Sequence, residues 1–257
     1  KGERFDGNMY AEEALKNGAS YAVVDRVVKK NKRIIKVDNT IETLQEIAIL
    51  HRKKISIPII AITGTNGKTT TKEIIKNCLS STFKTCTTKG NFNNHIGVPL
   101  TILSLKKTHQ IGIVELGANH IGEIKFLCNI AQPTHGIITN IGKAHLEGFK
   151  NFKNIIKTKN ELYNYLKSNK GIIFLNKNDS LLKNLIKEYQ NKYYYQCEEK
   201  KNKQKENILY FECNPFITFY VKTKKIETKI IGSYNANNIA AAIEIAKHFK
   251  VNKSEIY

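Results

Sequence analysis

Short apolar runs recur along the chain, and each is followed by a polar segment that contains glycine or asparagine. The runs have the length of buried strands, and several segments between them space their apolar residues as helices do. Strands are expected at residues 59–62, 83–87, 111–117, 136–141 and 171–176. Helices are expected at residues 69–79, 100–105, 122–131 and 154–167. This alternation predicts an α/β fold with a central, mostly parallel sheet.

The segment before this core repeats the pattern on a smaller scale. Its elements are expected at residues 8–17 (helix), 21–24 (strand), 34–37 (strand) and 40–53 (helix). We therefore predict that residues 1–56 are part of a small α/β domain and that residues 57–257 form the central domain.

The last part of the chain has a different period. Residues 181–195 are expected to be helical, and residues 198–206 to form a charged turn. Antiparallel strands are expected at residues 208–211, 216–222 and 226–231. An alanine-rich helix follows, and at its start Asn235 and Asn238 lie one helical turn apart. Two such amides suit the donor and acceptor edge of adenine, while helix capping by one and solvation of the other is the alternative.

The stretch PIIAITGTNGKTTTKE, residues 58–73, has the order strand, glycine turn, helix. This order places unpaired N–H groups at a helix N-terminus, where they and the helix dipole attract phosphate. Lys68 supplies a cation for the outer phosphates, and the Thr69 hydroxyl can ligate magnesium. The usual phosphate-loop pattern has four residues between its two glycines and would need a glycine where Ile62 stands. The alternative interpretation of this stretch is a surface turn before a helix.

Two more predicted strands end in polar residues. Glu115 lies near the end of the strand at 111–117, and His145 follows the strand at 136–141. Because parallel strands present their carboxyl ends at one edge of a sheet, these segments and the polar loop 88–99 should converge on the phosphate loop. Glu115 could then bind magnesium, and a surface carboxylate is the alternative. A lone histidine is usually structural, so metal or phosphate contact by His145 is left open.

Composition argues against several classes of protein. The chain has 257 residues, 41% of them hydrophobic, without an apolar run long enough for a membrane span or a signal peptide, and we expect a cytoplasmic protein. Five scattered cysteines without a C-x-x-C pair favour neither a disulfide framework nor a zinc site. The net charge of +20 would suit nucleic-acid binding, but the lysines are dispersed and favour a solvated basic surface.

Five motifs occur in one order: GTNGKTTTKE, GNFNNHIGVP, ELGANHIGEI, ITNIGKAHLEGF and G-x-Y-N-x-x-N-x-x-A-A. Together they resemble the ATP-dependent Mur ligases, and the short G-T-N-G-K-T resembles that family's own form of the loop. ELGANH and AHLEGF favour the members that join D-alanyl-D-alanine to UDP-N-acetylmuramoyl-tripeptide in peptidoglycan synthesis. Members that add earlier peptide residues, or polyglutamate to folate, are the alternative.

The resemblance implies a set of site residues. ATP would be held by Gly64, Thr65, Asn66, Gly67, Lys68, Thr69 and Thr70, with Asn235 and Asn238 at the adenine. Two magnesium ions would be held by Thr69, Glu115, His145 and Lys159. Lys159, in KNELY, would be carboxylated by CO2, with Lys157 as the fallback, and Lys68, His145 and Lys159 would be catalytic. The muramoyl substrate would lie near Asn93, Asn94 and His95.

The implied reaction transfers the γ-phosphoryl group of ATP to the tripeptide carboxylate, and the amine of D-alanyl-D-alanine then attacks the acyl phosphate. A monomer without nucleic-acid or membrane partners is expected. The resemblance also implies that the family's first domain is represented only by its last part and that the third follows Tyr257, so this chain would bind ATP but turn over poorly. Another phosphate-loop NTPase, or a basic RNA-binding protein, is the more distant alternative.

Overall fold

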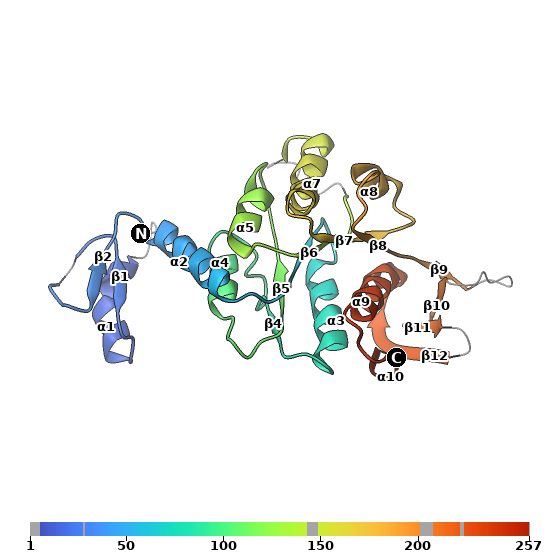
Figure 1. Cartoon of the computed structure of the whole chain (residues 1–257), viewed down its shortest axis with the longest axis horizontal. Coiled ribbons are helices and arrows are strands. Elements are labelled where there is room, and N and C mark those ends of the chain that lie inside the picture. Colours follow the sequence, from blue (N-terminus) through green and yellow to red (C-terminus); the bar gives the residue numbers. More distant parts are fainter. Residues whose placement is uncertain (1–5, 28, 143–148, 201–207, 222–223, 257) are drawn as a thin grey trace.

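The computed structural model describes residues 6–27, 29–142, 149–200, 208–221 and 224–256 (Figure 1). A large parallel sheet occupies the middle of the molecule, a small unit from the start of the chain lies at one end, and a second sheet lies at the other end. No helix in these described ranges is both long and apolar enough to cross a bilayer.

The central sheet has six strands, and every neighbouring pair is parallel. Its spatial order is β4 (Thr85–Thr87), β5 (Ile111–Glu115), β3 (Ile59–Thr63), β6 (His135–Ile138), β7 (Ile172–Asn176) and β8 (Lys192–Tyr195). All residues of β3 and β5 are buried, as expected for strands that are covered on both faces. The predicted α/β fold with a central parallel sheet is confirmed.

Helices cover both faces of this sheet (Figure 1). One face carries α3 (Lys68–Ser80) and α9 (Ala236–His248), and the other carries α2 (Thr40–Lys54), α4 (Gly97–Leu103), α5 (Glu123–Ala131) and α7 (Phe152–Ser168). Successive residues of β3 alternate between the two cores: Ile60 and Ile62 pack with α3 and α9, while Ile59 and Ala61 pack with the other group. The phosphate-loop strand is therefore fixed from both sides.

The first part of the chain is small. It contains η1 (Gly7–Tyr10), α1 (Ala11–Lys16), β1 (Ala22–Val24) and β2 (Ile34–Lys36), and its two strands pair in parallel around a minor apolar cluster. The next helix, α2, packs on the central unit, because Ala48 lies in the large core and buried Arg52 donates to the carbonyl oxygens of Ala131 at 3.0 Å and Gln132 at 3.2 Å. The division of the chain into domains at residues 56 and 57 stays a prediction.

One predicted element is wrong. Residues 181–195 do not form a single helix, because α8 (Ser180–Leu185) ends early and β8 follows it. The aromatic run in β8 has high strand propensity, and Tyr193 to Tyr195 pair with Phe174 to Asn176 of β7 at the edge of the central sheet. The pairing of β8 with β7, which forms only in the folded chain, outweighs the weak helical pattern of residues 181–195.

The second sheet lies beside α9. Its order is β12 (Lys224–Ile231), β11 (Phe216–Val221), β10 (Leu209–Cys213) and β9 (Cys197–Glu199). The three strands β10, β11 and β12 are antiparallel as predicted, and β9 adds to β10 in parallel. The first two residues of the predicted turn at 198–206 belong instead to β9, and residues 201–206 lie outside the described residues. After β12 come η2 (Ser233–Asn235), α9 and the short α10 (Lys253–Ile256).

Candidate active site

The glycine turn connects β3 directly to the N-terminus of α3. Gly67, which precedes the helix, has a φ of 76°, and Gly64 has a φ of 148°, values that residues with side chains rarely adopt. A Cβ atom at Gly64 would lie 2.0 Å from Oγ1 of Thr139. Glycine is therefore needed at this position both for its conformation and for its lack of a side chain.

The segment after β6 braces this turn. Asn140 accepts the N–H of Thr65 with its carbonyl oxygen at 3.0 Å and the N–H of Asn66 with its Oδ1 at 3.1 Å. The Thr139 hydroxyl donates to the carbonyl oxygen of Asn66 at 2.6 Å, and the N–H of Gly142 donates to Oγ1 of Thr65 at 2.9 Å. The sequence predicts no role for Thr139 and Asn140, because the strand is expected to extend through Ile141, whereas β6 ends at Ile138.

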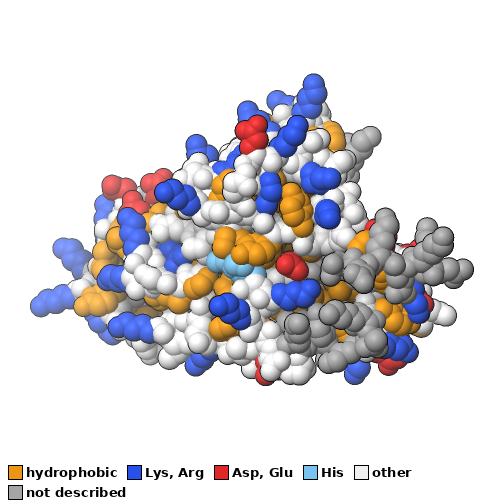
Figure 2. Space-filling model, turned by 45° about the vertical axis from the view of Figure 1, so that its right-hand side comes forward, with side chains coloured by type: hydrophobic (Ala, Val, Ile, Leu, Met, Phe, Trp, Pro, Cys, Tyr) orange, Lys and Arg blue, Asp and Glu red, His pale blue; other side chains and the backbone are white. Residues whose placement is uncertain are grey.

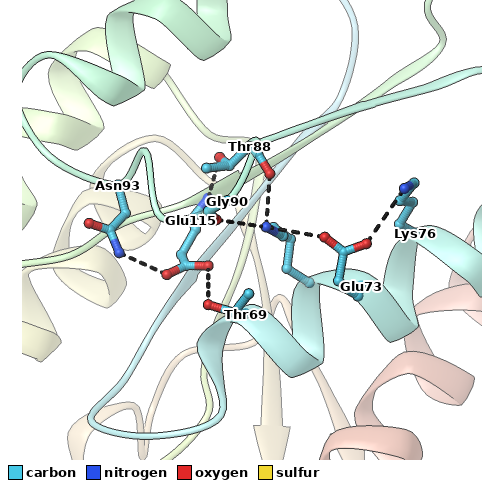
Figure 3. Close-up of polar contacts among 8 residues, drawn as sticks. Thr69, Glu73, Lys76, Thr88, Gly90, Asn93 and Glu115 are labelled. Atoms are coloured by element: carbon cyan, nitrogen blue, oxygen red, sulfur yellow. Dashed lines mark hydrogen bonds and ion pairs between the residues drawn. The ribbon is translucent and has the colours of Figure 1, made fainter.

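Lys68 and Thr69 open α3 and face the end of β5. Nζ of Lys68 donates to the carbonyl oxygens of Gly64 at 2.9 Å and Thr65 at 3.0 Å. Oγ1 of Thr69 donates to Oε2 of Glu115 at 2.9 Å (Figure 3). Burial lowers the pKa of Lys68, and the Glu115 carboxylate opposes this shift. The loop and the end of β5 thus meet at one edge of the sheet, although 46 positions separate Thr69 from Glu115.

The three residues expected near the substrate have different contacts. Asn93 donates Nδ2 to Oε1 of Glu115 at 2.8 Å (Figure 3). Oδ1 of Asn94 accepts the N–H of Gly97, the first residue of α4, at 2.9 Å. The backbone carbonyl of His95 accepts Nε2 of Gln45 on α2 at 3.0 Å. Asn93 is therefore the member of this set that touches the carboxylate beside the phosphate loop.

A cavity of about 400 Å³ lies beside these residues, which is a usual size for a small-molecule site. Its polar and glycine lining consists of Gly64, Thr65, Lys68, Asn93, Asn94, His95, Gly117, Asn119, His120, Glu123 and Lys159. Its apolar lining consists of Ala118, Phe126, Leu127, Phe149 and Ile155. The structure thus brings Lys68, Lys159 and the three residues of loop 88–99 around one space.

Lys159 projects from α7 into this cavity with 4% of its surface exposed, and its Nζ lies 5.7 Å from the centre of the Phe149 ring. Burial, and then the charge of Lys68, lower the pKa of Lys159 to about 8, against the opposing effect of Glu123 and Glu161. Lys157 is exposed. Of the two lysines weighed for carboxylation, Lys159 is the one in the cavity.

Two carboxylates near Lys159 accept backbone N–H groups around the start of α5. Glu161 on α7 accepts the N–H groups of Gly122 at 2.7 Å and Lys125 at 2.9 Å, which joins α7 to the start of α5. Glu123 accepts the N–H groups of Asn119 at 2.6 Å and His120 at 3.0 Å. Partial burial opposes ionisation of Glu123, but these hydrogen bonds prevail and lower its pKa. Both residues lie in motifs already noted, and no role was assigned to them.

Asn235 and Asn238 lie on the other side of the loop. Both are 8% exposed, and Nδ2 of Asn238 donates to Oδ1 of Asn235 at 2.9 Å. A Cβ atom at Gly67 would lie 3.0 Å from Nδ2 of Asn238, so the amide is in contact with the loop. Asn235 makes no capping hydrogen bond with its side chain at the start of α9, which removes the capping alternative.

His145 lies outside the described residues, so its place beside the site stays a prediction. Within the ranges that the structure describes, no three His, Cys, Asp or Glu side chains form a group able to hold a metal. Figure 2 shows Lys and Arg side chains dispersed over the visible face, without a continuous basic patch.

The fold and the loop define the class: an α/β protein with a glycine turn, a lysine and a helix N-terminus at the carboxyl edge of a parallel sheet. The Mur ligase middle domain matches residues 62–246. The chain belongs to the Mur ligase family, and the resemblance of its motifs is confirmed.

Curated relatives agree with this assignment. UDP-N-acetylmuramoyl-tripeptide–D-alanyl-D-alanine ligase of Bacillus subtilis is 33% identical over 98% of this chain and 55% of its own length. The ligase of the same name from Haemophilus influenzae is 34% identical over 100% of this chain and 57% of its own length. The chain therefore spans a little over half the length of these relatives.

Solved structures give the same result. Crystal structure I of MurF from Acinetobacter baumannii has a TM-score of 0.82 and 30% identity, covering 100% of this chain and 57% of the other. MurF ligase from Thermotoga maritima in complex with ADP has a TM-score of 0.80 and 30% identity, covering 100% of this chain and 61% of the other.

Proposed function

We propose that this chain is the ATP-binding part of a ligase that joins D-alanyl-D-alanine to UDP-N-acetylmuramoyl-tripeptide. The observation that carries the proposal is the meeting of Thr69, Glu115 and Asn93 in one hydrogen-bonded group beside a cavity that Lys68 and Asn93 line. The names of the curated relatives, and the ADP bound to the Thermotoga maritima structure, support it.

ATP would bind with its phosphates in the glycine turn. The first N–H groups of α3 have no acceptor within the helix, and with the helix dipole they favour an anion there. Lys68 would then donate to the β- and γ-phosphates in place of the carbonyl oxygens of Gly64 and Thr65. Asn238, beside Gly67, and Asn235, which accepts its amide hydrogen bond, would contact the adenine.

The oxygen atoms at Thr69 and Glu115 fit magnesium. Oγ1 and Oε2 of these residues are 2.9 Å apart, and magnesium is usually held by one or two such oxygens together with substrate phosphates rather than by an all-protein cage. When bound there, magnesium would neutralise charge on the phosphoryl oxygens. A second ion would be held by a carboxylated Lys159 and by His145, as the family resemblance implies.

Carboxylation of Lys159 is chemically accessible in this environment. The neutral amine attacks the carbon of CO2, a nitrogen–carbon bond forms, and one proton leaves the nitrogen to give an anionic carbamate. Starting from the ammonium cation, two protons are released in all. Because the pKa is lowered to about 8, a much larger share of the amine is neutral near neutral pH than for an ordinary lysine. The low pKa therefore favours the reactive form.

This chemistry predicts a pH-dependent carbamate. At constant dissolved 13CO2, the 13C NMR signal of the carbamate should grow from pH 6.5 to pH 8.5, because the neutral amine increases as pH rises through the lowered pKa. The signal should vanish in Lys159→Gln and remain in the matched control Lys157→Gln. A signal that survives in Lys159→Gln and vanishes in Lys157→Gln would show that Lys157 is the carboxylated residue and would contradict the proposal for Lys159.

The chain's own residues would act mainly by charge and position. A carboxylate oxygen of the tripeptide attacks the γ-phosphorus, and the bond to the β-phosphate oxygen breaks to give ADP and an acyl phosphate. The amine of D-alanyl-D-alanine attacks the acyl carbon, phosphate leaves, and the amine loses a proton. Lys68 would stabilise the charge on the transferring phosphoryl oxygens, and Asn93, Asn94 and His95 would position the muramoyl substrate. No serine or cysteine nucleophile is required.

Phosphate release tests this function in the protein that contains this chain. Rapid release should require ATP, UDP-N-acetylmuramoyl-tripeptide and D-alanyl-D-alanine together, because the second substrate must resolve the acyl phosphate. Multiple turnovers of phosphate with either peptide substrate omitted would instead favour a simple NTPase. Strong binding of RNA that weakens steeply with salt, without any dependence on Lys68, would favour the nucleic-acid alternative.

A further inference from the structure

Lys72 is a lysine on α3 whose side chain is completely buried, with 0% exposed. Burying an ammonium group is costly unless its donors are satisfied. Its Nζ donates to the carbonyl oxygens of Thr88 at 2.8 Å and Gly90 at 3.1 Å, and it forms an ion pair with Oε1 of Glu73 at 3.2 Å (Figure 3). These three partners match the three donors of an ammonium group.

The two carbonyl oxygens belong to the loop that leads from β4 to Asn93. Oγ1 of Thr88 accepts the N–H of Glu115 at 3.0 Å, which fixes the start of this loop on β5. At its other end, the carbonyl oxygen of Asn93 accepts the N–H of Gly117 at 2.8 Å. Lys72 therefore holds the loop between two points where it is already attached, one at the end of β5 and one at Gly117 just after that strand.

Glu115 receives one hydrogen bond from each side of this arrangement. Thr69 binds Oε2 from α3, and Asn93 binds Oε1 from the loop. Lys72 lies three positions after Thr69, on the same side of α3, and connects that helix to the same loop. The helix that carries the phosphate-loop lysine and the loop that faces the substrate are thus joined by one buried ammonium group.

We propose that Lys72 is a positioning residue that ties the loop of residues 88–93 to α3 and so holds Asn93 on Glu115. Lys72 does not line the cavity and does not touch the reacting groups; it acts through the loop. An apolar side chain could fill the same volume but could not donate to the two carbonyl oxygens. The expected effect on substrate binding rests on the proposed function, whereas the attachment of the loop to α3 by Lys72 does not.

The test compares Lys72→Met with Lys76→Met. Lys76 lies one turn further along α3, is partly exposed and pairs with the other oxygen of Glu73 at 3.5 Å, so its replacement controls for loss of a cation from this helix. Amide hydrogen exchange at residues 88–93 should be at least about tenfold faster in Lys72→Met, because the loop loses two charge-assisted hydrogen bonds. Exchange in α9 should be unchanged, and Lys76→Met should resemble the wild type.

The second readout is kinetic, in the protein that contains this chain. Lys72→Met should raise KM for UDP-N-acetylmuramoyl-tripeptide about tenfold while Kd for ATP changes less than about twofold, because only the loop loses its support. Asn93→Ala should raise the same KM, and combining the two replacements should add little. If Lys72→Met does not fold, Lys72→Gln, which keeps one donor group, is measured in the same two ways.

Unchanged exchange at residues 88–93 would overturn the proposal, and so would faster exchange spread evenly over the molecule, which indicates a purely structural role. A loss of ATP affinity as large as the rise in KM would also overturn it. Failure of the wild type to require both peptide substrates would instead contradict the proposed function, and the exchange result would still decide the role of Lys72.

Discussion

Replacing Lys68 with alanine is expected to weaken ATP binding about 100-fold, which corresponds to about 2.7 kcal/mol. The reason is the loss of a partly buried ammonium group that can make charge-assisted hydrogen bonds to the outer phosphates, each worth about 1.5 to 3 kcal/mol. Isothermal titration with ATP and MgCl2 measures this directly. Among the residues that the structure describes, Lys68 donates to the carbonyl oxygens of Gly64 and Thr65, bonds that the fold does not depend on, so the variant should fold.

Lys76→Ala is the matched control, because Lys76 lies on the same helix, is partly exposed and is paired with Glu73. It should bind ATP with the affinity of the wild type. Retention of wild-type affinity by Lys68→Ala would remove the central cation from the proposed site.

Replacing Glu115 with glutamine is expected to raise the magnesium concentration that half-saturates nucleotide binding at least about tenfold. The amide has the size of the carboxylate and can still accept the hydroxyl of Thr69, but it lacks the negative charge that a hard divalent cation favours. A magnesium titration at fixed ATP gives this value. Phosphate release at saturating ATP should fall by about three orders of magnitude, since charge on the transferring group is no longer neutralised.

Glu244→Gln is the control for this experiment. Glu244 lies on α9, where it pairs with Lys247 at 3.6 Å, and its replacement removes a carboxylate away from the end of β5. Its magnesium dependence should match that of the wild type. Equal magnesium dependence of Glu115→Gln and the wild type would mean that Glu115 has only a structural role.

The parallel sheet and the position of the loop could be predicted because they depend on local signals. β3 and β5 are short apolar runs ended by polar residues, and Gly67 marks the turn into α3. The rule that parallel strands end at one edge then places Glu115 beside Thr69, as the structure has it. The helical spacing of apolar residues also distinguishes Lys159 from Lys157, because Lys159 shares the buried face of α7 with Ile155 and Leu162.

The remaining features depend on pairings between distant residues. Asn140 reaches back 74 positions to Asn66, and nothing in its local sequence distinguishes it from any other polar residue after a strand. The sequence does not distinguish Lys72 from the many other lysines, because its partners, the carbonyl oxygens of Thr88 and Gly90, become known only from the structure. The sequence predicts a helix where β8 lies, because the pairing of β8 with β7 is not visible in a short window of sequence.

A crystal structure with ADP and magnesium tests the central claim most directly. The account predicts a magnesium ion at about 2.1 Å from Oγ1 of Thr69, with Glu115 in or next to its coordination shell and Nζ of Lys68 turned from the loop carbonyl oxygens toward phosphate. Nucleotide bound away from the glycine turn, or magnesium on its phosphates with Thr69 and Glu115 still bonded only to each other, would contradict it.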